Sequence, residues 1–552
     1  MPLGEGSPVE PGSWQLAAGH YQGYLDLAVV YPRPDNETSN YARHRHAYPG
    51  IKYEIPIGVM FGKWPYKYEM IEGPEWLSVE DETLQFDTVD KFIIPDGYGI
   101  LSGIAPSIAA DPANVVVRVY DQDHNRPSPS YVDVQFSVEV SPDNFVFVDV
   151  INGNEATATG TIDAPYKEVH AVRSAGGHGG KIMVMRQTPA LTEPQSEFGG
   201  GYIPASTSRI LTFSDKLNDP QSCINYPGES VIFNDRQSIT SWSTADAVTS
   251  FAFANSGDPD VFLSGFTVAY SAQDNAQNGR NVRVISVGGS NKRFTAWGLG
   301  FLRPHGGRVK NDNHGAIFGP AGTGTNTYSA RDRTYVVECW GNWMNHPDDL
   351  GDEASFSGRG SNGPHLAEFY STSRSLIERC TVSNSHLVNN LFLGPKGVAV
   401  KFEVRACDTT IGNTGENRHI RTTGFGVPEP EVNWQRGLSN RLVWCYNKTG
   451  DLSDGGSCNF GDNTSAPDQP ENEHFYTYRN SVTDAFWSLP AHDPKKVLAS
   501  RNVGGAVQST YIDEENVTGT RSEIYDANIN LKGEYRVQYL GTHGAEVSNG
   551  VE

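Results

Sequence analysis

The residues best suited to chemistry form a basic segment near the middle of the chain. In a protein whose net charge is −22, residues 301–315 carry five potential cations and one carboxylate within twelve positions. Such a cluster could neutralise an anionic group on a ligand and place a general base beside it. The alternative is a solvated surface loop. The residues concerned are Arg303, His305, Arg308, Lys310, Asp312 and His314.

Further carboxylates could complete such a site. Glu368 lies in the segment 365–370, at the end of an insertion rich in Gly, Asp and Ser. An insertion of this kind favours a surface loop, where binding function is commonly found, and it could form the wall of a groove. The other carboxylates considered are more commonly exposed strand positions, and they are Asp332, Glu338, Glu378 and Glu403.

Four cysteines indicate how the chain is arranged to position these residues. They lie in or near apolar runs, each has an Asn a few residues later, and their spacings are 41, 27 and 38 residues. Irregular repeats of this length are typical of a solenoid, in which equivalent residues stack from coil to coil. We expect a buried thiol ladder. The alternatives are disulfides or a metal site, the latter disfavoured because no C-x-x-C spacing occurs. The four residues are Cys339, Cys380, Cys407 and Cys445.

The first quarter of the chain has a different rhythm. Residues 1–23 are rich in Gly, Pro and Ser, and we expect an arm or linker there. Between residues 24 and 140, six or seven short alternating runs indicate an antiparallel β-sandwich. The segments 73–79 (GPEWLSV), 97–103 (GYGILSG) and 117–121 (VRVYD) resemble Ig or cadherin-like modules of bacterial surface and phage proteins. That resemblance concerns the fold and says little about function.

The segment that follows resembles the entry of a known repeat fold. Residues 145–149 (FVFVD) and 160–167 (GTIDAPYK) are similar to the first strand and cap of pectate-lyase-like, right-handed parallel β-helix proteins, with a short helix expected at 167–172. The resemblance implies a capped β-helix at 141–494 and a C-terminal β cap or oligomerisation segment at 495–552. The predicted fold class is therefore all-β, with an Ig-like sandwich before the solenoid.

The β-helix resemblance implies a polysaccharide ligand, because proteins of this family mostly handle such chains. In an elimination, Lys310 or His314 would be the base and Arg308 would neutralise the sugar carboxylate. In a hydrolysis, Asp312 or Glu368 would be the acid. Polar residues at equivalent strand entries would form a line along the glycan, and a Trp could stack on a sugar ring. These substrate-binding candidates are Trp343, His386, Asn390, His419 and Arg421.

Composition disfavours several other functions. A pI near 5.1 argues against nucleic acid and anionic membranes as partners, since phosphates are bound by basic surfaces. No run approaches 18 apolar residues, so no membrane insertion is expected. The acidic run at 348–353 could bind Ca²⁺ through its oxygens, but it does not match the EF-hand loop and is more commonly a solvated loop. The sequence therefore predicts no cofactor and no metal site.

The leading hypothesis is a phage tailspike that binds and cleaves a cell-surface or extracellular polysaccharide. Such a protein would be extracellular or virion-associated, and the resemblance implies a homotrimer. One alternative is a secreted bacterial polysaccharide lyase or glycoside hydrolase. Another is a non-catalytic glycan-binding adhesin or structural virion protein. By analogy of fold, we favour an enzyme over a protein that only binds.

Overall fold

The architecture comes from a computed structural model, which describes most of the N-terminal half and the strands of the remainder. The predicted arm at 1–23 lies outside the described residues. Of the predicted C-terminal segment 495–552, six residues are described. The described ranges are 27–38, 40, 42–62, 64–80, 99–121, 131–192, 199–203, 211–213, 222–235, 248–255, 260–271, 282–289, 293–304, 316–321, 333–342, 344, 366–370, 374–384, 389–396, 401–409, 418–423, 440–445, 447–449, 458–461, 472–478, 481–482, 487–488, 497–500 and 507–508.

Residues 27–140 form an N-terminal module of mainly antiparallel strands, which we call the sandwich. A four-stranded sheet has the order β2-β9-β8-β5, and a three-stranded sheet has the order β3-β7-β6. A third pair joins β1 to β4. The strands are β1 (Ala28–Tyr31), β2 (His46–Ala47), β3 (Lys52–Pro56), β4 (Gly58–Met60), β5 (Lys67–Glu72), β6 (Leu77–Glu80), β7 (Ile100–Ile104), β8 (Ala110–Tyr120) and β9 (Tyr131–Val140).

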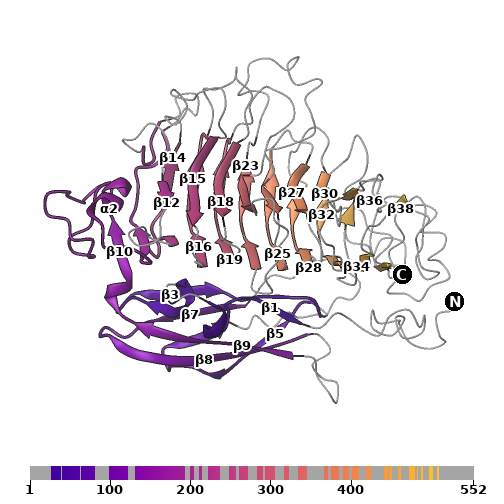
Figure 1. Cartoon of the computed structure of the whole chain (residues 1–552), viewed down its shortest axis with the longest axis horizontal. Helices are drawn as coiled ribbons and strands as arrows, with labels where there is room; N and C mark the ends of the chain where they lie inside the picture. Colours follow the sequence, from indigo (N-terminus) through magenta and orange to yellow (C-terminus); the bar gives the residue numbers. More distant parts are fainter. Residues whose placement is uncertain are drawn as a thin grey trace, which may run out of the picture.

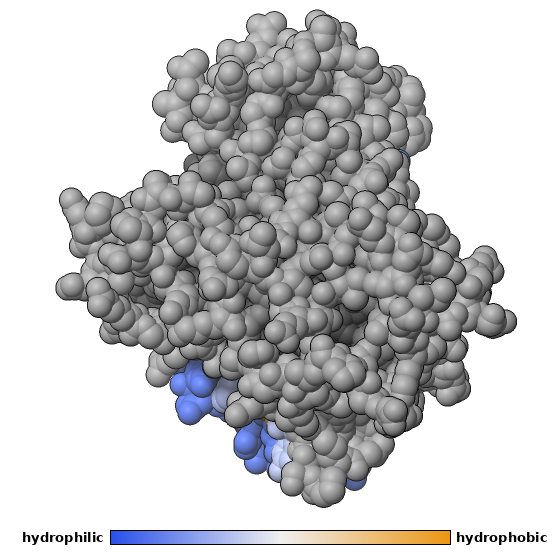
Figure 2. Space-filling view, turned by 90° about the vertical axis from the view of Figure 1, so that its right-hand side faces the viewer, coloured by the Kyte–Doolittle hydropathy of each residue, from blue (hydrophilic) through white to orange (hydrophobic). Residues whose placement is uncertain are grey.

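Alternation of residue types explains the longest pair of strands, β8 and β9. Successive side chains of a strand point to opposite faces, so Val117 and its register partner Val134 are both buried. The next residues along, Arg118 and Asp133, pair on the outer face, with Nε 2.7 Å from Oδ1. The described surface at the base of Figure 2, on the side of the sandwich, is correspondingly hydrophilic.

Beyond β10 (Phe145–Val148) and the helix α2 (Val169–Ala175), the chain passes through three parallel sheets in turn. One passage through the three sheets is here called a coil, and the whole set is called the stack. The helix lies close to the one expected at 167–172. Figure 1 shows the strands stacked along the long axis of the molecule, with the sandwich along one side. The chain is thus mostly β, with parallel sheets, as its sequence predicted.

Within the described ranges, the three sheets contain 11, 10 and 8 strands. The 11-stranded sheet holds β10, β11 (Ile182–Met185), β13 (Ser222–Asn225), β16 (Asp260–Ser264), β19 (Arg293–Trp297), β22 (Arg333–Val337), β25 (Arg374–Glu378), β28 (Lys401–Arg405), β31 (Asn440–Cys445), β34 (Asn472–Tyr478) and β37 (Val497–Ser500). The 10-stranded sheet holds β12 (Leu211–Phe213), β15 (Val248–Asn255), β18 (Val282–Gly289), β21 (Ile317–Ala321), β24 (Ala367–Tyr370), β27 (Asn389–Lys396), β30 (Arg418–Thr423), β33 (Cys458–Gly461), β36 (Trp487–Ser488) and β38 (Val507–Gln508). The 8-stranded sheet holds β14 (Val231–Asn234), β17 (Phe266–Ala269), β20 (Gly300–Leu302), β23 (Trp340–Asn342), β26 (Thr381–Ser383), β29 (Asp408–Thr409), β32 (Lys448–Thr449) and β35 (Ser481–Val482).

A left-handed residue forms the corner between the 11-stranded and 8-stranded sheets. Its φ lies between 52° and 73° on five successive coils, and its N–H donates to a carbonyl of the next coil. The residue after each corner is buried in the interior of the stack. The corner residues are Gly265, Gly298, Glu338, Arg379 and Ala406.

Three of the four predicted ladder cysteines occupy the position after this corner. Cys339, Cys380 and Cys407 are buried on successive coils, and the Cys380 N–H donates to Cys407 Sγ at 3.4 Å. The prediction was wrong for Cys445, because the register aligns it with Arg405, which precedes the corner. Asn447 takes the ladder position instead, and its Oδ1 accepts from the Cys407 N–H at 2.9 Å. The five cysteines whose side chains are described are free thiols, so a disulfide framework is wrong for them.

The sandwich covers the outer face of the 11-stranded sheet, and the two bodies share one apolar core. The Tyr31 ring stacks on Phe262 with ring centroids 5.5 Å apart. Gly58 lets β4 approach the sheet closely, because a Cβ at this position would lie 2.8 Å from the Tyr335 ring. The shared core continues along the sheet to Leu376 and Val443. The sandwich is therefore packed along several coils rather than tethered at one end.

A buried ionic network also joins the two bodies, and Arg405 is at its centre. The Arg405 guanidinium donates through Nε and Nη2 to the two oxygens of Glu378, both at 3.0 Å. Its Nη1 donates to Glu403 Oε1 at 3.0 Å and to the Tyr66 hydroxyl of the sandwich at 2.9 Å. The side chains of the three ionic residues are at most 1% exposed. The sequence-based expectation that Glu378 and Glu403 are exposed strand positions was therefore wrong, since the sandwich covers them.

The two carboxylates of this network are satisfied from both bodies. The Tyr335 hydroxyl donates to Glu378 at 2.9 Å, and the Phe61 N–H donates to Glu403 at 2.5 Å. Burial raises the pKa of Glu403 above its ordinary value, while Arg405 acts in the opposite direction. The Arg405 guanidinium also lies 5.2 Å from the centre of the Trp64 ring. The arginine thus pairs with carboxylates of its own sheet and reaches the sandwich through Tyr66 and Trp64.

Removing Arg405 should cost far more stability than removing an exposed arginine with similar geometry. Arg405→Met leaves two buried carboxylates without their cation, and we expect a loss of about 3–5 kcal/mol in the free energy of unfolding. Arg118→Met is the matched control, since Arg118 is also bidentate to a carboxylate but is exposed. It should lose much less. Urea denaturation of both variants measures the difference, and equal losses would show that the network does not hold the interface.

Acid should destabilise the fold through His44 and His46. Both rings are buried, and burial lowers their pKa values to about 3 and about 4. In the unfolded chain each ring takes a proton near pH 6.5, so the stability they supply is complete above that pH and is lost as the pH falls towards 4. The pair should contribute a loss on the order of 3 kcal/mol between pH 7 and pH 5.

Urea denaturation at a series of pH values measures this loss, and His44→Phe is the matched variant. The His44 ring packs edge-on against Tyr31 and Phe136, with centroids 5.3 and 5.2 Å apart, and a phenyl ring can keep both contacts. Because a phenyl ring cannot take up a proton, the variant should lose about half as much free energy of unfolding between pH 7 and pH 5 as the histidine pair does. An acid profile identical to that of the parent protein would contradict the assignment.

Candidate functional site

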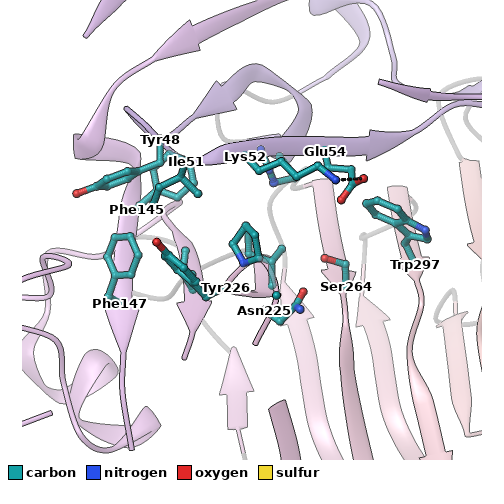
Figure 3. Close-up of a pocket in the computed structure, with 15 residues that line it drawn as sticks. Tyr48, Ile51, Lys52, Glu54, Phe145, Phe147, Asn225, Tyr226, Ser264 and Trp297 are labelled. Atoms are coloured by element: carbon teal, nitrogen blue, oxygen red, sulfur yellow. Dashed lines mark hydrogen bonds and ion pairs between the residues drawn. The ribbon is translucent and has the colours of Figure 1, made fainter. Parts of the chain in front are cut away.

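A cavity of about 180 Å³ lies between the sandwich and the ends of strands in the 11-stranded sheet. Its volume is close to that of six water molecules at about 30 Å³ each, which is room for one small ring-shaped ligand. Figure 3 shows β3 of the sandwich on one side and the coil strands on the other. Neither body forms the cavity alone, so its shape depends on the docking described above.

Three consecutive coils supply the floor. Ser264 and Trp297 are register partners at the ends of β16 and β19, and Asn225 ends β13. The indole N–H of Trp297 donates to Glu338 Oε2 at 3.3 Å, which orients the ring. The strands end here because the left-handed corners Gly265 and Gly298 follow directly. The corner thus determines where these side chains emerge from the sheet.

A braced turn forms one end of the cavity. Arg186 is bidentate to Glu229, with Nε 2.9 and 2.8 Å from the two carboxylate oxygens. The Arg186 guanidinium also lies 4.3 Å from the centre of the Tyr226 ring. Asn225 Nδ2 donates to the Glu229 carbonyl at 3.2 Å. The Tyr226 ring and the Asn225 amide are therefore held in place before any ligand arrives.

The sandwich supplies the opposite wall. The Tyr48 ring packs edge-on against Phe145 and Phe147, with ring centroids 5.4 and 5.1 Å apart. Burial raises the pKa of Tyr48, and Asp163 and Tyr226 add to the effect, so its hydroxyl stays protonated near neutral pH. Lys52 and Glu54 of β3 form an ion pair with Nζ 2.8 Å from Oε1, and Lys52 is exposed. The wall therefore offers an aromatic ring and a charged pair.

The arrangement suits binding better than bond cleavage. Aromatic faces with a few fixed amide and hydroxyl groups are typical of small-molecule sites. Among the residues that line the cavity, Glu54 is the sole carboxylate, and it is paired with Lys52. A glycosidase needs two carboxyl groups. Within the described part of the chain, no group of three or more His, Cys, Asp and Glu side chains is placed to hold a metal ion.

None of the predicted site residues with described backbone lines this cavity. The residues Arg308, Lys310, Asp312, His314, Trp343 and His386 lie outside the described residues, as does the acidic run 348–353. Glu368, Asn390, His419 and Arg421 have described backbone, and all four lie in the 10-stranded sheet. The register pairs Glu368 with Leu393 and Leu393 with Arg421. Glu368 and Arg421, two predicted site residues on different strands, thus occupy equivalent register positions, with one strand between them. We call such a set of equivalent positions a register column.

Sequence reasoning did not single out the cavity residues. Trp297 precedes the corner glycine Gly298, and the segment 225–228 (NYPG) is typical of a turn. An aromatic residue directly before such a corner was the available signal. The contribution of Tyr48 could not be found in this way, because it depends on the docking of a distant segment.

Comparisons with known proteins give a distant likeness in fold. No protein-family model matches the chain, and no curated protein matches it. A solved structure, the GH136 lacto-N-biosidase from Eubacterium ramulus, aligns with a TM-score of 0.33 and 8% sequence identity. The alignment covers 67% of this chain and 66% of that one, which is slightly under two thirds of its length. Among the described residues, no helix is long and apolar enough to cross a membrane.

A pair of glycine substitutions should separate backbone strain from disturbance of the cavity. Both Gly265→Ala and Gly298→Ala place a Cβ on a left-handed corner, at a cost of about 1–2 kcal/mol. A Cβ on Gly298 meets nothing within 4 Å, whereas a Cβ on Gly265 would lie 1.8 Å from Asn225 Oδ1. We therefore expect Gly265→Ala to lose about 1–3 kcal/mol more in the free energy of unfolding. Chemical denaturation checks this, and equal losses would mean that Asn225 is not fixed.

Proposed function

We propose that the protein binds a polysaccharide and holds one of its sugar units in the cavity between the sandwich and the stack. The observation that carries the proposal is the composition of the cavity. Figure 3 shows Tyr226 and Trp297 at opposite ends of a floor formed by Asn225 and Ser264. Apolar ring faces match the faces of a sugar ring, and amide and hydroxyl groups match its hydroxyl groups.

The repeating coils support the part of the proposal that the ligand is a polymer rather than a single sugar. We take the stack to be a right-handed parallel β-helix and the sandwich to be an Ig-like module. A surface that repeats once per coil, at about 4.8 Å, can present equivalent groups to successive units of a polymer. Cleavage of that polymer is assigned to the 10-stranded sheet, where Glu368 and Arg421 share a register column. Turnover would be read as new reducing ends, with ultraviolet absorbance added in an elimination.

The biological setting proposed is that of a phage tailspike, extracellular or virion-associated. It rests on the resemblance in the sequence and on the depolymerase chemistry that this resemblance implies. Its distinguishing consequence is a homotrimer, which light scattering of the purified protein would detect as three times the mass of one chain. A monomer would favour the secreted lyase or glycoside hydrolase.

Removing the aromatic faces of the cavity should weaken glycan binding. We expect Trp297→Ala to lower affinity about thirtyfold, which corresponds to about 2 kcal/mol, and Tyr226→Ala to act in the same direction. The measurement is affinity electrophoresis in gels containing neutral and acidic polysaccharides. Tyr131→Ala is the control, because Tyr131 is an aromatic residue that is 47% exposed and does not line the cavity. Unchanged retardation of both cavity variants, or equal weakening by the control, would sink the proposal.

A further inference from the structure

A buried arginine borders the cavity, and its contacts with the described residues are all with uncharged groups. Arg43 lies in the 3-10 helix η2 (Arg43–Arg45), which packs against β16, whose last residue, Ser264, belongs to the cavity floor. Arg43 lines the cavity and is 5% exposed. Its Nη1 donates to the His46 carbonyl, and its guanidinium lies 4.8 Å from the centre of the Tyr53 ring. Its Nε is buried without a hydrogen-bond partner.

The one described carboxylate that acts on Arg43 already has a partner. Burial lowers the pKa of Arg43 below its ordinary value. The groups that act in the opposite direction are, in order of their effect, Tyr53, Tyr31 and Glu54. Burial raises the pKa values of both tyrosines, so their hydroxyl groups are neutral near pH 7. Glu54 forms its ion pair with Lys52 instead, with Nζ 2.8 Å from Oε1.

The lining of the cavity therefore carries an excess of positive charge. Among the described residues that line it, Arg43 and Lys52 are cations and Glu54 is the carboxylate, so two positive charges face one negative charge. Figure 3 shows Lys52 and Glu54 on the side of the cavity opposite Ser264 and Trp297. The whole chain, by contrast, carries −22. A cleft whose lining differs in sign from the rest of the protein favours a ligand of the opposite charge.

The chemistry of a guanidinium indicates which anion would fit. A buried cation is unfavourable unless it is paired. Arg405, at the same interface, meets two carboxylates within 3.0 Å, whereas Arg43 meets none among the described residues. A carboxylate binds a guanidinium through charge-assisted hydrogen bonds, often two in parallel. Its single charge matches the excess in the lining, whereas a phosphate monoester carries about −1.5 to −2 near pH 7.

We propose that the cavity binds a sugar unit that carries one carboxylate, and that Arg43 is the residue that selects this unit over a neutral sugar. Lys52 adds positive charge at the rim, and Asn225 and Ser264 remain for the sugar hydroxyl groups. The inference rests on the proposed function in taking the ligand of the cavity to be a sugar, and it adds the chemical class of that sugar. Because the cavity holds one unit, a polymer needs only one such acid within its repeat.

The test compares pairs of glycosides that differ only in a carboxylate in place of a hydroxymethyl group. Methyl galacturonoside is paired with methyl galactoside, and methyl glucuronoside with methyl glucoside. In calorimetric titrations of the full chain, we expect the acid of at least one pair to bind about tenfold more tightly than its neutral partner. Arg43→Met should abolish this preference and leave the affinity for the neutral sugar unchanged. Arg118→Met, on the outer face of the sandwich, is the control and should keep the preference.

A second variant tests the same charge without removing a buried side chain. Glu54 is partly exposed, and Glu54→Gln raises the excess in the lining by one charge and releases Lys52. It should increase the affinity for the acidic glycoside about threefold and leave the affinity for the neutral one unchanged. This result decides the matter if Arg43→Met melts at a lower temperature than the parent protein. An affinity for the acid that does not rise would contradict the inference.

The outcomes separate this inference from the proposed function. Equal affinities for the acidic and neutral members of both pairs, or equal weakening of both by Arg43→Met, would overturn the role of Arg43 and leave the sugar site in place. Tighter binding of galactose 6-sulfate than of methyl galacturonoside would overturn the assignment to a carboxylate. If Trp297→Ala weakens neither sugar while Arg43→Met abolishes the preference, the aromatic site of the proposed function fails and the selection by Arg43 stands. If no glycoside binds, both proposals fail.

Discussion

The docking of the sandwich onto the 11-stranded sheet is the interaction on which the rest of this structure depends. Without it, the rings of Tyr335 and Phe262 and the side chain of Leu376 would form an exposed apolar strip along several coils. Soluble proteins rarely expose strips of that kind. Glu403 would also lose the Phe61 N–H, and Arg405 would lose the Tyr66 hydroxyl. The cavity follows from the same docking, because Tyr48 lines one side of it and Trp297 the other.

The charged groups at this interface determine where the sandwich docks. The outer face of a stacked sheet is nearly periodic, so apolar contacts alone would differ little if the sandwich moved by one coil, about 4.8 Å. Arg405 belongs to a single coil, and it needs both the Tyr66 hydroxyl and two carboxylates at once. A shift by one coil would take the Tyr66 hydroxyl away from Arg405 and the Phe61 N–H away from Glu403, and it would leave these buried charged groups with unsatisfied hydrogen bonds, which is unfavourable. We therefore interpret the network as the element that selects one docking register among several of similar apolar contact.

Local patterns predicted much of the fold, and they failed wherever distant segments meet. The alternating valines of β8, the cap helix and three ladder cysteines each follow from a few neighbouring residues. Cys445 has the same kind of apolar context as Cys407, yet it precedes the corner because local context does not set the register. Alternation along the strand predicts that the Glu378 side chain points away from the interior of the stack. Glu378 therefore looked exposed, and for that reason it was a candidate carboxylate. Glu378 is instead covered by Tyr66 and its neighbours. This segment is distant in sequence, because Tyr66 lies 339 residues from Arg405, with which it forms a hydrogen bond.

The distribution of charge limits the glycans that this protein can bind. Among the described residues, six arginines and six carboxylates are buried. The buried groups therefore balance, and the net charge of −22 belongs to the rest of the chain. A glycan with an anionic group on each repeat would be repelled by most of such a surface.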